Sequence, residues 1–117
     1  MELNDTHLRY LLAVHRMTRS RPEASSKDIA KCLSVSKASV TSMMTILVDK
    51  GLVDKERYGK IRLTDAGNRL AQGLSDRMLT LARTLQSQME LTEEEARKAA
   101  CAAVCELPGH CIASAAS

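Results

Sequence analysis

Aromatic side chains are almost absent from this sequence. The 117 residues include no phenylalanine or tryptophan and only two tyrosines, Tyr10 and Tyr58, although 44% of them are hydrophobic. The core must therefore consist of leucine, valine, isoleucine, methionine and alanine, a composition typical of packed helices. A chain of this length corresponds to one domain. Its own core is small, so a partner subunit could help to cover its apolar helices.

Long apolar runs are missing as well. No uncharged apolar segment reaches the length of about 18 residues that a membrane-spanning helix needs, and the initial MELND does not combine a basic region with an apolar run. The sequence therefore predicts neither secretion nor membrane insertion. We expect a cytoplasmic protein with no membrane partner, whose thiols are reduced.

The charge is small but unevenly distributed. The net charge is +3, yet residues 1–63 carry 12 Lys and Arg against 7 Asp and Glu, whereas residues 64–117 carry 5 against 7. A basic half of this kind favours contact with nucleic acid, although a solvated surface can produce the same asymmetry.

Helical periodicity begins close to the N-terminus. Residues 5–18 place leucines on one side at helical spacing, and residues 26–33 predict a short second helix capped by Ser25 or Ser26. Cys32, beside Leu33, is expected to be a small buried hydrophobic residue.

The next segment is more specific. Ser34 and Val35 form a tight connection, Ser36 is a plausible N-cap, and Gly51 ends a helix with an apolar stripe. Two helices joined by so short a turn form the helix-turn-helix pattern. The apolar stripe consists of Val40, Met43, Met44 and Leu47.

Two short strands are predicted after this helix. They cover Leu52–Arg57 and Lys60–Leu63 and are joined at Tyr58-Gly59, where glycine permits turn conformations closed to most residues. A hairpin directly after a helix-turn-helix is a wing. Its basic and aromatic side chains could straddle a phosphate backbone, and they are Lys55, Arg57, Tyr58, Lys60 and Arg62.

Two further helices are predicted. Thr64 caps a long one with an apolar stripe, which we expect to pack against the last helix and a second subunit. In the last helix, Thr92 and Glu95 form a capping box, and Pro108-Gly109 ends it. The stripe of the long helix consists of Leu70, Leu74, Met78, Leu81 and Leu85.

The predicted fold is mainly α with a small β-hairpin. Residues 1–63 form a winged helix-turn-helix DNA-binding domain, and residues 64–117 form a helical dimerisation region with a frayed tail. We expect a homodimer that binds palindromic double-stranded DNA, with the helix that starts at Ser36 in the major groove. The predicted DNA-binding residues are Ser36, Lys37, Ala38, Ser39, Thr41, Ser42, Arg57, Tyr58 and Lys60.

Four segments together resemble the iron- and manganese-dependent repressors, the diphtheria toxin repressor family. They are HLRYLLAVHRM, SSKDIAKCLSVSKASVTSMMTILVDKGLV, KERYGKIRLTDAGNRLA and LTEEEARKAAC. The resemblance implies a dimeric transcription factor whose DNA affinity is tuned by a divalent ion, here in a short form without the family's SH3-like domain.

The metal positions implied by this resemblance have mostly changed. The first-helix ligand falls on Thr6, and a neighbouring acid falls on Arg9. The family's Cys/Glu-x-x-Glu-His motif falls on Cys101, Val104 and Cys105, so one cysteine matches, the acid is missing and a thiol replaces the imidazole. The remaining ligand positions fall near Met78, Ala82 and Arg97.

The C-terminal cysteines leave several interpretations open. Cys101 and Cys105 lie four residues apart on one helix face and, with His110 and Cys111, could hold Fe, Mn or Zn. The thiols could also serve an iron–sulfur cluster or a disulfide switch. The simplest reading is that small side chains allow close helix packing.

Other function classes are compatible with the same fold. One is a MarR-type regulator with a small-molecule pocket at its dimer interface, and another is a winged-helix protein-interaction module without a DNA role. Catalysis is not expected, because no acid accompanies a Cys–His pair to orient a base.

Overall fold

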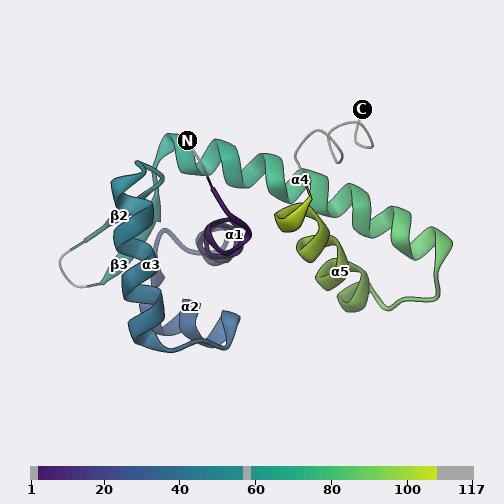
Figure 1. Ribbon diagram of the computed structural model, residues 1–117, viewed down its shortest axis with the longest axis horizontal. Coiled ribbons are helices and arrows are strands. Elements are labelled where there is room, and N and C mark those ends of the chain that lie inside the picture. Colours follow the sequence, from purple (N-terminus) through teal and green to yellow (C-terminus); the bar gives the residue numbers. More distant parts are fainter. Residues whose placement is uncertain (1–2, 57–58, 108–117) are drawn as a thin grey trace. The chain divides into compact units, whose positions relative to one another are not determined.

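A computed structural model describes residues 3–56 and 59–107 of the chain (Figure 1). The chain divides into two compact units, Met1–Gln72 and Gly73–Ser117, and the division falls within the longest helix. The fold is mainly helical with one small sheet, which confirms the predicted fold class. In chain order the elements are α1 (Asp5–Thr18), β1 (Ala24–Ser25), α2 (Ser26–Leu33), α3 (Lys37–Asp49), β2 (Val53–Lys55), β3 (Lys60–Leu63), α4 (Asp65–Gln88) and α5 (Glu93–Glu106).

Helix α1 supplies much of the core of the first unit. The Asn4 side chain accepts a hydrogen bond from the backbone N–H of His7, and Nδ1 of His7 accepts one from the N–H of Asn4. These reciprocal bonds satisfy two of the donors that a helix start leaves open. The helix contacts α2, α3 and β3. Its buried residues are Tyr10, Leu11, Leu12, Ala13, Val14 and His15.

Helices α2 and α3 form the predicted helix-turn-helix. Ser25 caps α2 by accepting from the N–H of Asp28, and Ser36 caps α3 by accepting from the N–H of Ser39. Between them, Ser34 adopts a left-handed conformation, with φ of 56°, that ends α2. On α3 the predicted stripe faces the core: Val40, Met44 and Leu47 are fully buried and Met43 is half-buried.

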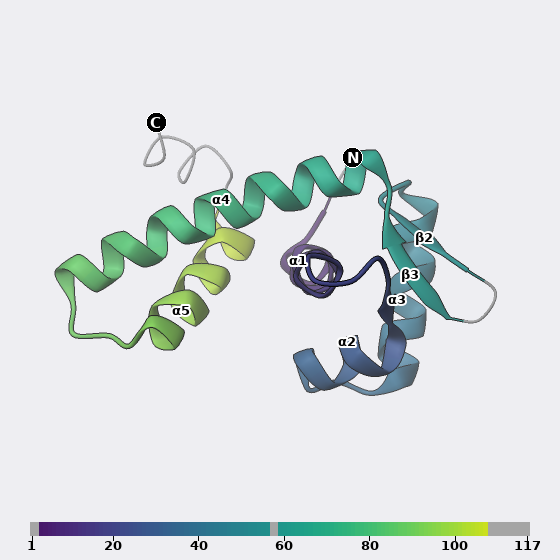
Figure 2. The same cartoon turned by 180° about the vertical axis from the view of Figure 1, so that it is seen from behind.

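The small sheet has the strand order β1-β3-β2 and is antiparallel throughout. Helix α3 contacts the hairpin strand β2, and Figures 1 and 2 show the helix and the hairpin side by side from opposite directions. The first hairpin strand ends at Lys55, two residues before the predicted end. Strand β1 was not predicted; it pairs Ala24 with Ile61 and Ser25 with Lys60.

A tight junction joins the hairpin to α4. The Thr64 hydroxyl donates to the carbonyl oxygen of Gly51 at 2.7 Å and accepts from the N–H of Gly67 at 3.0 Å, so Thr64 caps α4 as predicted. The Thr64 N–H also donates to the carbonyl oxygen of Leu52 at 3.1 Å. A Cβ atom at Gly67 would lie 1.9 Å from that same oxygen. The start of α4 can therefore approach the backbone only because position 67 is glycine.

The second unit packs the later turns of α4 against α5. Its buried centre consists of three alanines, Ala82, Ala96 and Ala100. Small side chains at a helix contact allow the two backbones to approach closely. Partly buried side chains of Met78, Leu81, Leu85 and Leu91 surround this centre. The predicted capping box of α5 is present: the N–H of Glu95 donates to the Thr92 hydroxyl, and the N–H of Thr92 donates to Oε1 of Glu95.

This capping box predicts a dependence of stability on pH. The hydrogen bonds from the backbone N–H and then the side chain of Thr92 hold the pKa of Glu95 below its usual value of 4.5. A lowered pKa in the folded state stabilises the fold above pH 4.5, and that contribution disappears as the pH falls through the lowered value. As the pH is lowered through this acidic range, we expect the free energy of unfolding of Glu95→Gln to fall less than that of the wild type. Chemical denaturation at several pH values measures this difference. Glu93→Gln, outside the capping box, should behave like the wild type; equal pH profiles for all three proteins would contradict the prediction.

No helix in the described ranges is both long enough and apolar enough to cross a membrane.

Candidate nucleic-acid interface

The first two turns of α3 present an open polar surface. The buried residues Val40 and Met44 turn one side of the helix toward the core. The other side is exposed and carries four hydroxyl groups and one cation. Six predicted DNA-binding residues are exposed at this place: Ser36, Lys37, Ala38, Ser39, Thr41 and Ser42.

Two of these hydroxyl groups also hold the helix in shape. Oγ of Ser36 accepts from the N–H of Ser39 at 3.0 Å and lies 2.9 Å from Oγ of Ser39. The Thr41 hydroxyl donates to the carbonyl oxygen of Lys37 at 3.1 Å. Its proton is therefore committed within the helix, and what Thr41 offers outward is a hydroxyl acceptor and a methyl group.

An open hollow of about 280 Å³ lies beside this surface. We call it the lysine hollow; it is lined by Ser25, Ser26, Lys27, Lys37, Thr41, Lys55 and Gly59. These residues come from the end of β1, the start of α2, the start of α3, the end of β2 and the hairpin turn. None of the described residues that line it is acidic. The hollow is therefore a concentration of positive charge against the exposed start of α3.

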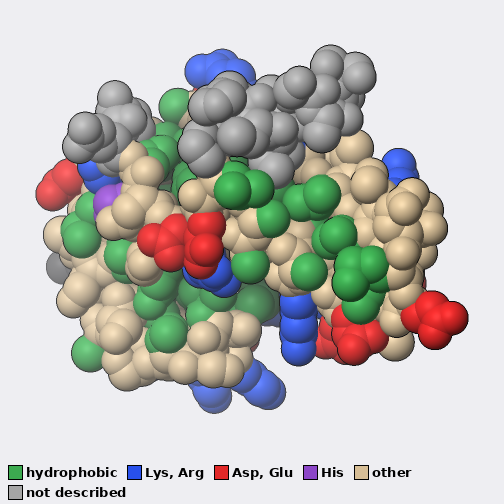
Figure 3. Space-filling view, turned by 45° about the vertical axis from the view of Figure 1, so that its right-hand side comes forward, with side chains coloured by type: hydrophobic (Ala, Val, Ile, Leu, Met, Phe, Trp, Pro, Cys, Tyr) green, Lys and Arg blue, Asp and Glu red, His purple; other side chains and the backbone are tan. Residues whose placement is uncertain are grey.

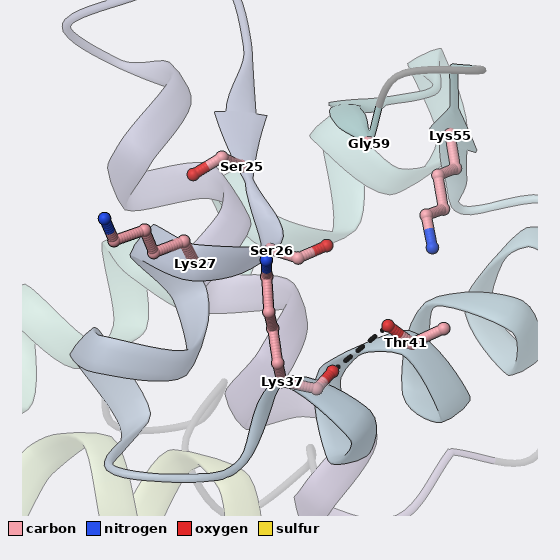
Figure 4. Close-up of a pocket in the computed structure, with 7 residues that line it drawn as sticks. All are labelled: Ser25, Ser26, Lys27, Lys37, Thr41, Lys55 and Gly59. Atoms are coloured by element: carbon pink, nitrogen blue, oxygen red, sulfur yellow. Dashed lines mark hydrogen bonds between the residues drawn. The ribbon is translucent and has the colours of Figure 1, made fainter.

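The three lysines are oriented differently (Figure 4). Lys55 extends from β2 toward Thr41, and Lys37 extends from α3 toward Ser26 at the start of α2. Lys27 points away from the other two. Lys37 and Lys55 are thus the cations directed into the space between the elements, and Lys27 lies at its edge.

The cations of β3 are in a different situation. Nζ of Lys60 lies 3.6 Å from a carboxylate oxygen of Glu23, and the Arg62 guanidinium forms an ion pair with Glu56. Lys60, a predicted DNA-binding residue, is exposed but already has an acidic neighbour. Two other predicted residues, Arg57 and Tyr58, lie outside the described residues.

Lys27 was not among the predicted site residues, and Lys55 was predicted only as one cation of the hairpin. The sequence signal that could have pointed to Lys27 is its place in the first turn of a capped helix, where exposed backbone N–H groups favour an anion. Its proximity to α3 and β2 depends on the tertiary fold.

The cysteines do not assemble a metal site in the described part of the chain. Cys101 is half-buried and Cys105 is buried on α5, while His110 and Cys111 lie outside the described residues. Within residues 3–56 and 59–107, no three His, Cys, Asp or Glu side chains come together to hold a metal ion. The residues present there do not fit the metal centre that the family resemblance implies.

The prediction for Cys32 was wrong, because its side chain is exposed. Ile29 is the buried residue of α2, and Leu33 is partly buried one turn later. Successive helical residues are separated by about 100°, so Cys32 lies beyond the edge of the stripe that these two residues define.

The fold of this chain is similar to those of several solved structures. IdeR of T. acidophilum superposes with a TM-score of 0.80 at 22% identity, over 92% of this chain and 51% of that one. The manganese regulator SloR superposes with a TM-score of 0.77 at 23% identity, over 98% of this chain and 53% of that one. A hypothetical protein from Sulfolobus solfataricus superposes with a TM-score of 0.67 at 24% identity, over 97% of this chain and 86% of that one. The fold is a winged helix. In it, α2 and α3 are the helix-turn-helix and β2 and β3 are the wing.

The sequence comparisons are more limited. The model of the MarR family, whose members share the winged helix, matches residues 2–59. No curated protein matches the sequence. The chain spans about half the length of IdeR and SloR, so the structural likeness supports the fold of this chain and not the activity of those proteins.

Proposed function

We propose that this chain is a dimeric transcription regulator that binds double-stranded DNA through α3 and the wing. The observation that carries the proposal is the exposed hydroxyl surface at the start of α3, directly beside the lysine hollow. Small polar side chains allow a helix to approach base edges closely, and the major groove is wide enough to admit a helix. Lysines beside it can bind the phosphate backbone and fix the orientation of the protein. The similarity to structures described as a manganese regulator and a manganese-activated repressor supports this role.

Dimerisation through the second unit is part of the proposal. Its α4–α5 pair is too small to cover its own apolar side chains, and Figure 3 shows several hydrophobic groups at the surface there, with acidic groups at the lower right. A second copy of the chain would cover this face and create two-fold symmetry, which a palindromic site matches. Among the described residues of this unit, the exposed large hydrophobic side chains are Leu79, Met89 and Leu107.

A small-molecule-responsive regulator of the MarR type is a second candidate. The family model that matches residues 2–59 favours it, and the lack of a described three-ligand metal site is compatible with it. Both candidates use the same surface for DNA. They differ in the signal: a regulator of this second type would change its DNA affinity on binding an organic ligand.

Duplex binding at low salt tests the shared part of the proposal. In fluorescence anisotropy, a short duplex of random sequence should bind, and the logarithm of the affinity should fall linearly with the logarithm of salt concentration. Light scattering of the complex should show two chains per duplex. A protein-interaction module without a DNA role would leave the duplex unbound even at the lowest salt concentration, and that result would refute the proposal.

A further inference from the structure

We propose that the lysine hollow seats a phosphate group of the DNA backbone, and that it supplies more of the electrostatic affinity than the cations of β3. This inference rests on the proposed function and ranks the basic residues that serve it. It makes the start of α2 and the end of β2 part of the interface, together with α3.

The distribution of charge supports this ranking. Lys27, Lys37 and Lys55 line the hollow, and no acidic side chain in the described ranges lies within ion-pair distance of their ammonium groups. Lys37 and Lys55 are directed into this concavity, with Lys27 at its edge, and together they raise the local positive potential. A phosphate placed there would relieve the repulsion between the two inward-directed cations. Each close ammonium–phosphate pair is attractive, and the attraction is stronger where water is excluded.

The hydrogen-bonding groups of the hollow also suit an anion. Oγ of Ser25 accepts from the N–H of Asp28, and within the described part of the chain its own proton has no acceptor. The Ser26 hydroxyl, which Figure 4 shows pointing toward the side of Lys55 and Thr41, can donate to a phosphate oxygen. The carboxylate of Asp28, which would repel an anion, is engaged by Arg21 at 3.1 Å. The volume of about 280 Å³ equals that of several water molecules, each of which occupies about 30 Å³, so a phosphate group fits.

The cations of β3 are less available to a phosphate. Glu23 lies beside Lys60, and Glu56 lies beside Arg62, so each pair is close to neutral. An incoming phosphate would have to displace the carboxylate or approach against its repulsion. Exposed ion pairs of this kind contribute little to stability, but they lower the net attraction for an anion at this part of the wing.

Salt dependence distinguishes the two sets of cations. With the random-sequence duplex, we expect Lys55→Ala to reduce the magnitude of the log–log salt slope by about 0.9 for each chain bound. Lys60→Ala, which removes a lysine that already has an acidic neighbour, should reduce it by less than half as much. Lys98→Ala removes the same charge in the second unit, which contributes no residue to the hollow, and should leave the slope unchanged. If Lys60→Ala reduces the slope as much as Lys55→Ala, the ranking is wrong.

A titration without DNA separates failure of this inference from failure of the proposed function. Inorganic phosphate at constant ionic strength should shift the backbone amide NMR signals of Lys27, Thr41 and Gly59 in the wild-type protein. These shifts should be lost in the folded Lys37→Ala/Lys55→Ala double variant, whose fold is checked by circular dichroism. Shifts spread evenly over the chain, or unchanged in the double variant, would refute the phosphate seat even if duplex DNA binds. Localised shifts without duplex binding would refute the proposed function and leave the seat supported.

Discussion

Replacing Gly67 by alanine is expected to lower the free energy of unfolding by about 3 kcal/mol, the upper range for forcing extra atoms into packed structure. The added Cβ would lie 1.9 Å from the carbonyl oxygen of Leu52. That oxygen belongs to the backbone and already accepts from the N–H of Thr64, so neither partner can move without breaking the junction. Chemical denaturation followed by circular dichroism measures the loss.

The same helix contains a matched control. Gly73 also lies within α4, but a Cβ placed there meets no atom within 4 Å. Gly73→Ala should therefore stabilise the protein by about 0.5–1 kcal/mol, the usual gain when alanine replaces glycine inside a helix. Equal stabilities for the two variants would show that the close approach at Gly67 does not constrain the fold.

Replacing Thr41 by glutamate is expected to reduce duplex affinity by about 100-fold or more. The change places a carboxylate on the exposed side of α3 and against the lysine hollow. Like charges juxtaposed across an interface cost several kcal/mol, and each 1.4 kcal/mol is about a tenfold change in affinity. Fluorescence anisotropy at a fixed low salt concentration measures the effect.

Thr84→Glu is the matched control for this substitution. Thr84 is also an exposed helical threonine, and its hydroxyl donates to the carbonyl oxygen four residues earlier at 3.1 Å, as that of Thr41 does. It lies on α4 in the second unit, which contributes no residue to the proposed interface. Similar affinity losses in both variants would point to a general effect of net charge and would contradict the assignment of α3 to DNA.

The helices were predictable because their signals are local. A capping side chain acts on a backbone group three residues away, as Ser36 does on Ser39 and Thr92 on Glu95. Apolar periodicity then indicates which side of each helix is buried, and Val40, Met44 and Leu47 confirm this for α3. These signals suffice to define the helix-turn-helix.

Strand β1 was not predicted, because its formation depends on contacts that are not local in the sequence. Two residues are too few to show an alternating pattern, and Ala24 and Ser25 become a strand only by pairing with Ile61 and Lys60. Strand β2 is shorter than predicted for a similar reason, because the extent of a strand depends on where its partner strand ends. Such pairing joins positions that are far apart in the chain, and local propensity carries little information about it.

The candidate site was predictable only in part. The hydroxyl surface of α3 follows from the sequence because it is the polar side of a single helix. The lysine hollow is lined by Lys27, Lys37 and Lys55 from three elements, and the ion pair of Lys60 with Glu23 joins β3 to the residue before β1. A count of basic residues could not separate cations with acidic neighbours from those without them.

The placement of the two tyrosines has a practical consequence for spectroscopy. Both belong to the first unit, where Tyr10 is buried in α1, and residues 73–117 contain no aromatic side chain. Intrinsic tyrosine fluorescence therefore reports on the first unit alone, whereas the far-ultraviolet dichroism of the helices reports on both units. Recording the two signals in one denaturation experiment reveals whether the units unfold together, with no label and no engineered residue.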